Sequence, residues 1–302
     1  MIDINRLPGG LRGLVVRYPV ATFIATVLPL VSAVLALPIL AEYGRLPGKN
    51  LPALVGIDME EAASFLMVVA LFSTAVAFTW MADGRKGVQI FFRRMARWRV
   101  DLRWWTLAIF ALPTGTVVVA IASGDQAAVP SPATLAGEVA SLVIALLLIN
   151  LAEEAAWSGY LQTRLERNVP FVVASALTAV PFALVHLPIR VVAREATTAG
   201  DLLASFVTLL ILGLFVRSLF GAVMRGASNS VLLAATTHTF FNRSNNVDGV
   251  AADILRGDNR QAGALLTTVV LTVGVLVLER RRLTRAYRRE LDAHEGEPSL
   301  SP

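Results

Sequence analysis

The amino-acid sequence predicts an all-α fold, a polytopic transmembrane helix bundle, and three observations carry this prediction. Of the 302 residues, 55% are hydrophobic and only 16% are charged, whereas an average globular chain carries about 25% charged residues. The mean hydropathy is +0.63. A helix needs about 20 predominantly apolar residues to cross a bilayer, and apolar runs of this length recur along the chain. These features argue against a soluble protein.

Length and composition place about eight apolar stretches in order along the chain. The first stretch follows Arg12 and Arg17 as a secretory signal would, but it is longer than the apolar core of such signals, so we expect it to be retained. The seventh stretch is short and polar, and it contains His238. One membrane domain, residues 1–302, is expected to hold all of them: 19–40, 62–81, 105–123, 135–157, 171–189, 202–220, 227–242 and 261–278.

The basic residues predict how these helices are oriented. If both termini are cytoplasmic, 20 of the 27 Lys and Arg residues fall in cytoplasmic segments, with Arg217 and Arg225 counted among them. This asymmetry follows the positive-inside rule. An odd number of spans would place the basic segment 279–302 outside, so the charges favour an even number of spans and a basic cytoplasmic tail. We therefore expect a multi-pass protein of the cell membrane.

Residues 84–104 form the most basic stretch, with Phe91, Phe92 and Trp98 among the arginines. At helical spacing this pattern is amphipathic, so we expect the segment to lie in the inner membrane interface beside anionic lipid headgroups. A net charge of +5 and a pI near 10.2 could also indicate nucleic-acid binding. Because the positive-inside rule accounts for the cations, we expect the lipid bilayer as a partner and no nucleic acid.

Ionisable residues inside the apolar stretches are few, and the ones that stand out lie in three of them. Glu153 and Glu154 are adjacent in the fourth stretch, His186 ends the fifth, and His238 with Asn242 lies in the seventh. Each of these could alone be a packing feature. Burying ionisable groups in a bilayer is costly, however, so their joint occurrence predicts a functional site. The chain has no cysteine, which excludes disulfides, a thiolate nucleophile and Cys-ligated zinc.

Positions along the helices predict that these groups lie at one depth. Glu154 lies about 14 residues before the turn near Asn168 and His186 about 18 residues after it, so each lies roughly 20–27 Å from that turn. The next turn at that end of the bundle lies near Arg225. His238 and Asn242 lie about 13 and 17 residues after it, again roughly 20–25 Å along the helix. Since adjacent carboxylates repel, we expect one of the pair to stay protonated, or the pair to share a cation, a proton or a metal.

At these residues the sequence resembles the CPBP family, the CAAX protease and bacteriocin-processing membrane proteins. The family motifs EExxxR, FxxxH and HxxxN or HxxxD occur in that order on successive helices. Here the corresponding residues are 153–158, 182–186 and 238–242, within a CPBP-like core at 135–242. The order and spacing together make the resemblance specific, although each motif alone is a weak signal.

One position departs from the family pattern. Ser158 stands where the family has arginine, so the expected ion pair along this helix is missing and Glu154 must find another partner, stay protonated or bind a metal. Trp157 and Phe182 lie within the first two motifs, and we expect them to support the substrate or the catalytic groups.

The resemblance implies a glutamate-dependent intramembrane endopeptidase. Glu153 with His186 would activate a water molecule, Glu154 would complete the glutamate pair, and His238 with Asn242 would stabilise the oxyanion. The substrate would be a peptide or protein, and a lipid-modified one if it is like the prenylated CAAX proteins that eukaryotic relatives process.

Two alternatives remain open at the level of the sequence. The first concerns a cofactor, because Glu153, His186 and His238 match a His₂Glu zinc site with one open position. No HExxH motif is present, and metal-free water activation is the preferred interpretation. The second concerns function: the chain could be a non-catalytic immunity or scaffold protein, as Ser158 suggests, or a proton-coupled transporter, although no internal repeat is evident.

Overall fold

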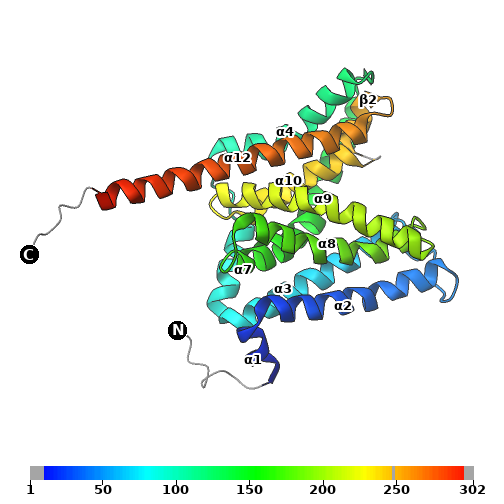
Figure 1. Cartoon of the computed structure of the whole chain (residues 1–302). Helices are drawn as coiled ribbons and strands as arrows, with labels where there is room; N and C mark the ends of the chain where they lie inside the picture. The colour runs from blue at the N-terminus through cyan, green and yellow to red at the C-terminus, as the bar shows by residue number, and fades with distance from the viewer. Residues whose placement is uncertain (1–9, 247–248, 296–302) are drawn as a thin grey trace, which may run out of the picture.

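The computed structural model describes residues 10–246 and 249–295, and these form an all-α bundle (Figure 1). Seven helices within the described residues are long and apolar enough to cross a membrane. The predicted fold class is therefore confirmed, and the protein is a multi-pass membrane protein. The spans are α2 (Pro19–Glu42), α3 (Met59–Met95), α4 (Leu102–Ala122), the continuous helical segment Pro132–Leu165, α8 (Phe171–Val192), α9 (Ala199–Gly226) and the first part of α12 (Arg260–Glu295).

The seventh apolar stretch of the sequence forms a helix that is shorter than a membrane span. This helix, α10 (Val231–Asn245), has 15 residues and so is about 22 Å long, less than the roughly 30 Å of a bilayer core. It packs against α4, α9, α12 and α6 (Leu151–Glu154). Because other helices surround α10, its polar residues contact protein groups. Of the eight spans expected, seven are therefore long enough to cross a membrane, and the remaining passage through the bundle is the shorter, enclosed helix α10.

The two ends of the described chain lie at the same end of the bundle. In Figure 1, α1 (Gly10–Arg17) and the far end of α12 both lie on the left. This placement agrees with an even number of passages through the bundle when α10 is counted. Which side of the membrane this end faces stays a prediction. The last part of the expected basic tail, residues 296–302, lies outside the described residues.

Short elements connect the helices at the opposite end. β1 (Gln126–Ala127) and β2 (Leu255–Arg256) form a two-stranded antiparallel sheet that joins the loop after α4 to the loop before α12. α11 (Val250–Ile254) precedes β2, and the 3₁₀ helix η2 (Pro52–Val55) lies between α2 and α3.

The helix that carries both glutamates departs from regular α geometry on each side of them. It runs as α5 (Pro132–Ile144), the π-helix η3 (Ala145–Asn150), α6, the π-helix η4 (Ala155–Gln162) and α7 (Thr163–Leu165). π-helical turns are rare and often occur at functional sites. Every residue of η4 is buried, so the sequence after the glutamates lies in the centre of the bundle.

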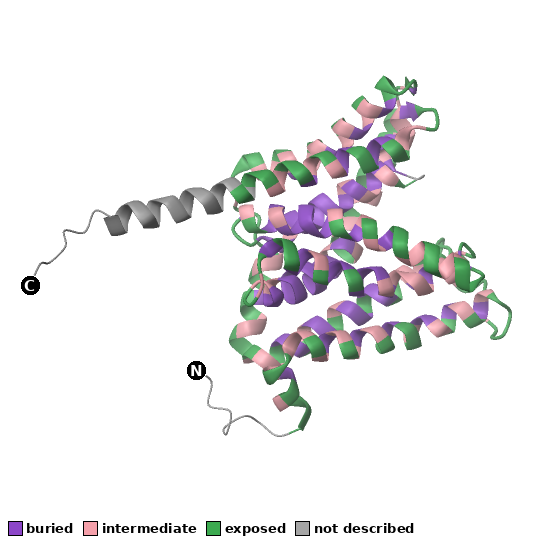
Figure 2. Ribbon diagram, viewed as in Figure 1, coloured by how far each residue is buried: buried purple, intermediate pink, exposed green. Residues whose placement is uncertain are grey.

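The core surrounds this helix. Trp157 and Tyr160 of η4 are fully buried and pack against Phe23 of α2. Figure 2 shows the buried residues gathered at the centre of the bundle and the exposed residues on its outer faces. Many of the exposed residues are apolar, such as Leu148 and Val270. An apolar exterior is expected where helices face lipid, because lipid tails are as apolar as leucine.

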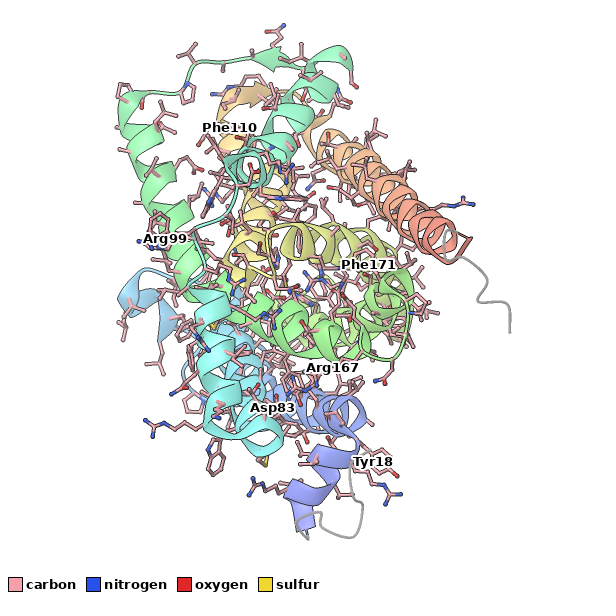
Figure 3. All side chains as sticks on the ribbon, turned by 90° about the vertical axis from the view of Figure 1, so that its left-hand side faces the viewer. Tyr18, Asp83, Arg99, Phe110, Arg167 and Phe171 are labelled. Atoms are coloured by element: carbon pink, nitrogen blue, oxygen red, sulfur yellow. The ribbon has the colours of Figure 1, made fainter. Side chains whose placement is uncertain are left out.

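The basic segment begins at a break in α3. Gly84 has φ 65° and ψ −163°, a conformation that is almost restricted to glycine. Helix resumes over 85–95 and ends at Met95, and α4 begins at Leu102. Figure 3 looks onto this end of the bundle and labels Asp83 and Arg99, which lie just before the break and after the helix. Trp98 is exposed. The location of segment 84–104 at the membrane interface stays a prediction.

Candidate active site

Glu153 and Glu154 are consecutive but face different helices, because successive residues are about 100° apart around a helix axis. Glu153 is 3% exposed, and its Oε1 accepts a hydrogen bond from Nε1 of Trp157 at 3.2 Å. The same oxygen lies 3.7 Å from Nε2 of His186 on α8. Glu154 is fully buried and contacts α9 and α10. The two carboxylates therefore have separate partners.

Hydrogen bonding assigns the roles of the two nitrogens of His186. Its Nδ1 lies 2.7 Å from the backbone oxygen of Phe182. A carbonyl oxygen can only accept, so Nδ1 carries the hydrogen, and Nε2 is the nitrogen that faces Glu153 and can accept a proton. The His186 side chain is 21% exposed, against 5% for that of Glu153. The pair is therefore more open on the histidine side.

Both oxygens of Glu154 accept hydrogen bonds. Oε2 accepts from Oγ of Ser158 at 2.5 Å. Oε1 accepts from Nη2 of Arg217 at 2.5 Å and from Nδ1 of His238 at 2.9 Å. The two carboxylates therefore do not share a cation as expected: Arg217 pairs with Glu154 alone, and Glu153 faces His186.

Arg217 corrects one expectation from the sequence. It was counted among the cytoplasmic cations, but it lies within α9 and its side chain is completely buried. Its guanidinium carbon lies 5.0 Å from the ring centroids of both Phe182 and Phe220. A buried charge is tolerated when an opposite charge pairs with it, and aromatic faces attract a guanidinium further. Glu154 and the two rings therefore offset part of the cost of burying Arg217, whose Nε and Nη1 are buried without a hydrogen-bond partner among the described residues.

Asn242 lies one helical turn after His238 on α10 and is oriented by Asn150 of η3. Its Nδ2 donates to Oδ1 of Asn150 at 3.3 Å, and Nδ2 of Asn150 donates to Oγ1 of Thr239 at 2.9 Å. Asn150 is 1% exposed. An amide nitrogen has two hydrogens, so Asn242 keeps one for a further acceptor.

The two expected support residues lie against the catalytic candidates. The ring of Phe182 packs edge-on against Trp157, with centroids 6.1 Å apart, and lies 4.5 Å from the ring of His186. Phe182 therefore contacts His186 through its ring and its backbone carbonyl, and Trp157 contacts Glu153 through its indole N–H.

The donor set does not fit a resident metal ion. In the part of the chain that the structure describes, no group of three or more His, Asp or Glu side chains could hold a metal. Glu153, His186 and His238, the three expected zinc ligands, are therefore not arranged as a coordination site. Since Nδ1 of His238 donates to Glu154, its Nε2 is the nitrogen left for another partner.

The residues that the sequence singled out form three contacts, and two further residues take part in them. Glu153 lies beside His186, Glu154 bonds to His238, and Asn242 bonds to Asn150. Sequence reasoning missed Arg217 and Asn150. Both were detectable in principle, because each is a polar residue within a predicted apolar stretch.

One comparison with known proteins gives a match. Residues 135–244 match the family model described as type II CAAX prenyl endopeptidase Rce1-like. This segment contains both glutamates, both histidines and Asn242. No curated protein and no solved structure matches the chain.

Proposed function

We propose that the chain is an intramembrane endopeptidase in which Glu153 and His186 activate water. The match of residues 135–244 to the Rce1-like type II CAAX prenyl endopeptidase model supports this proposal. The observation that carries this proposal is the approach of Glu153 Oε1 to His186 Nε2, at 3.7 Å, in a buried site. Both atoms can accept a hydrogen bond from one water molecule held beside them.

The first step is the addition of water to the scissile carbonyl. The base pair takes one proton from the water while its oxygen forms a bond to the carbonyl carbon, and the carbonyl oxygen becomes an oxyanion. Collapse of this tetrahedral intermediate breaks the C–N bond. The proton taken from the water passes to the leaving nitrogen, so the immediate products are a carboxylic acid and an amine. The acid then ionises, and its proton goes to the released amine, which leaves a carboxylate and an ammonium group. Glu153 and His186 thus serve first as base and then as acid.

Asn242 and His238 are the proposed oxyanion donors. Asn242 can offer the Nδ2 hydrogen that Asn150 does not use. His238 donates Nδ1–H to Glu154, so it can donate to the oxyanion from Nε2 when that nitrogen also carries a hydrogen. Both oxygens of Glu154 already accept hydrogen bonds. We therefore assign Glu154 the role of holding His238 in place.

The substrate is proposed to be a peptide that reaches the site from the bilayer. The site lies within helices that cross the membrane, and His186 is its more open side. The family description supports a lipid-modified C-terminal peptide as the substrate. An attached prenyl chain would stay in the lipid while the peptide bond enters the polar site, which agrees with the apolar outer faces of the bundle.

A non-catalytic immunity or scaffold role is the main alternative. Its best support in the sequence was Ser158, which leaves the glutamate helix without its arginine. Arg217 pairs with Glu154 in the structure, so the absence of arginine at position 158 does not leave that carboxylate unpaired. This favours the peptidase.

Cleavage of a quenched peptide library by detergent-purified protein tests the proposal. Wild type is compared with Glu153→Ala and His186→Ala, each with and without a chelator. We expect cleavage by wild type that is lost in both variants and unaffected by the chelator. Full-rate cleavage in both variants would show that a different site, or a contaminant, is responsible.

A further inference from the structure

The cation that neutralises Glu154 comes from a different helix. We propose that Arg217 is a positioning residue of the active site: it supplies from α9 the positive charge that the glutamate helix lacks at position 158, and it holds Glu154 so that Glu154 can orient His238. This role rests on the proposed peptidase function, in which His238 faces the substrate.

Arg217 and His238 both donate hydrogen bonds to the same oxygen of Glu154. Nη2 of Arg217 and Nδ1 of His238 both donate to Oε1 of Glu154, at 2.5 Å and 2.9 Å. Ser158 holds the other oxygen. A carboxylate fixed at both oxygens cannot rotate, so the ring of His238 has one position in which its Nδ1–H is satisfied. Arg217 therefore acts on the ring through the carboxylate.

The surroundings of Arg217 fix the guanidinium itself. It lies between the rings of Phe182 and Phe220, and the Phe220 ring stacks on His238 with centroids 5.0 Å apart. One turn earlier, a Cβ added at Gly213 would lie 3.3 Å from atoms of Ala179 and Phe182. The absence of a side chain at Gly213 lets α9 approach α8 closely, which brings Arg217 over the Phe182 ring.

Ser158 and Arg217 are complementary in size as well as in charge. Both side chains are completely buried, and both contact the carboxylate of Glu154. A long cationic side chain at position 158 would have to fit beside a carboxylate that Arg217 already contacts, in a fully buried site. The site should therefore function with one arginine, at either position 158 or position 217. It should be impaired with arginine at both positions or at neither.

A charge-transplant experiment tests this inference. Arg217→Met removes the cation, and we expect kcat to fall about 10- to 100-fold with KM changed by less than about threefold. Ser158→Arg alone should also impair the enzyme, because two cations then crowd one carboxylate. The double variant Ser158→Arg/Arg217→Met should recover kcat to within about fivefold of wild type. Arg225→Met, on the same helix, is the matched control and should leave kcat unchanged.

A second readout does not depend on peptide cleavage. The chain has three histidines, so a spectrum of protein labelled with ¹⁵N-histidine contains three rings, which His186→Gln and His294→Gln variants assign. The Nδ1–H resonance of His238 should be that of a hydrogen-bonded proton in wild type. It should shift or broaden in Arg217→Met and return in the double variant.

The outcomes separate this inference from the proposed function. If no variant cleaves peptide but the His238 resonance responds as described, the positioning role holds and the peptidase assignment fails. An unchanged resonance and unchanged kcat in Arg217→Met would overturn the positioning role. If Arg217→Met does not fold, the double variant decides: a folded, active double variant supports the inference, and a folded but inactive one overturns it.

Discussion

Isosteric substitution of the two adjacent glutamates should affect different properties. Glu154→Gln should lower the stability of the protein, whereas Glu153→Gln should lower its activity. Glu154→Gln removes the negative charge beside Arg217, whose guanidinium is completely buried. Breaking a buried ion pair by removing one partner typically destabilises a protein by about 3–5 kcal/mol. Glu153→Gln keeps an oxygen that can accept from Trp157, so its free energy of unfolding should change by about 1 kcal/mol or less.

Although Glu153→Gln should change the stability little, it should strongly lower the rate of the reaction. Loss of a general base typically lowers the rate by about 10²- to 10⁴-fold, so Glu153→Gln should be a stable protein with little activity. The assay is unfolding in mixed micelles with increasing denaturing detergent, followed by tryptophan fluorescence, beside peptide cleavage by the same preparations. A Glu154→Gln protein as stable as wild type, or a strongly destabilised Glu153→Gln protein, would refute this division of roles.

Four further predictions follow from the same structure. Asn242→Ala should lower kcat by about 10²- to 10³-fold, as removal of an oxyanion donor does, and an unchanged kcat would remove Asn242 from the oxyanion site. Dialysis against a chelator should leave cleavage unchanged, and restoration by added zinc after a loss would contradict metal-free activation. Gly84→Ala should destabilise the protein by about 1–3 kcal/mol through backbone strain. The control Gly137→Ala, in a helix with open space around it, should not destabilise the protein. Equal stability of the two variants would exclude strain at the break in α3. Because the chain has no cysteine, single cysteines at the exposed positions Lys86 and Lys49 can report topology, with Lys49→Cys labelled from outside intact cells and Lys86→Cys only after permeabilisation; the reverse pattern would invert the predicted orientation.

Composition and spacing were sufficient to predict most of the fold. Runs of apolar residues gave the helices because a bilayer requires long uninterrupted segments. The exception was α10, which sequence reasoning took for a span. Its 15 residues are enclosed by other helices, and hydropathy cannot tell a helix enclosed by protein from one in lipid.

The candidate site residues were recognisable in the sequence for a related reason. Glu153, His186 and His238 are ionisable residues in apolar stretches, and their distance from the helix turns placed them at one depth. What the sequence could not supply was pairing between helices. Because Ser158 stands where the family has arginine, Glu154 was expected to need another partner, and the cation that pairs with it lies 63 residues away, at Arg217. Helix rotation decides such contacts, and the π-helical turns beside the glutamates alter that rotation.

Hydrolysis of a peptide bond by Glu153 and His186 within the membrane can be followed by mass spectrometry. A synthetic farnesylated peptide with a C-terminal CAAX sequence is incubated in H₂¹⁸O with wild type or Glu153→Gln protein reconstituted in lipid vesicles. We expect one new C terminus carrying ¹⁸O with wild type and intact peptide with Glu153→Gln. Equal cleavage by both proteins would contradict this assignment.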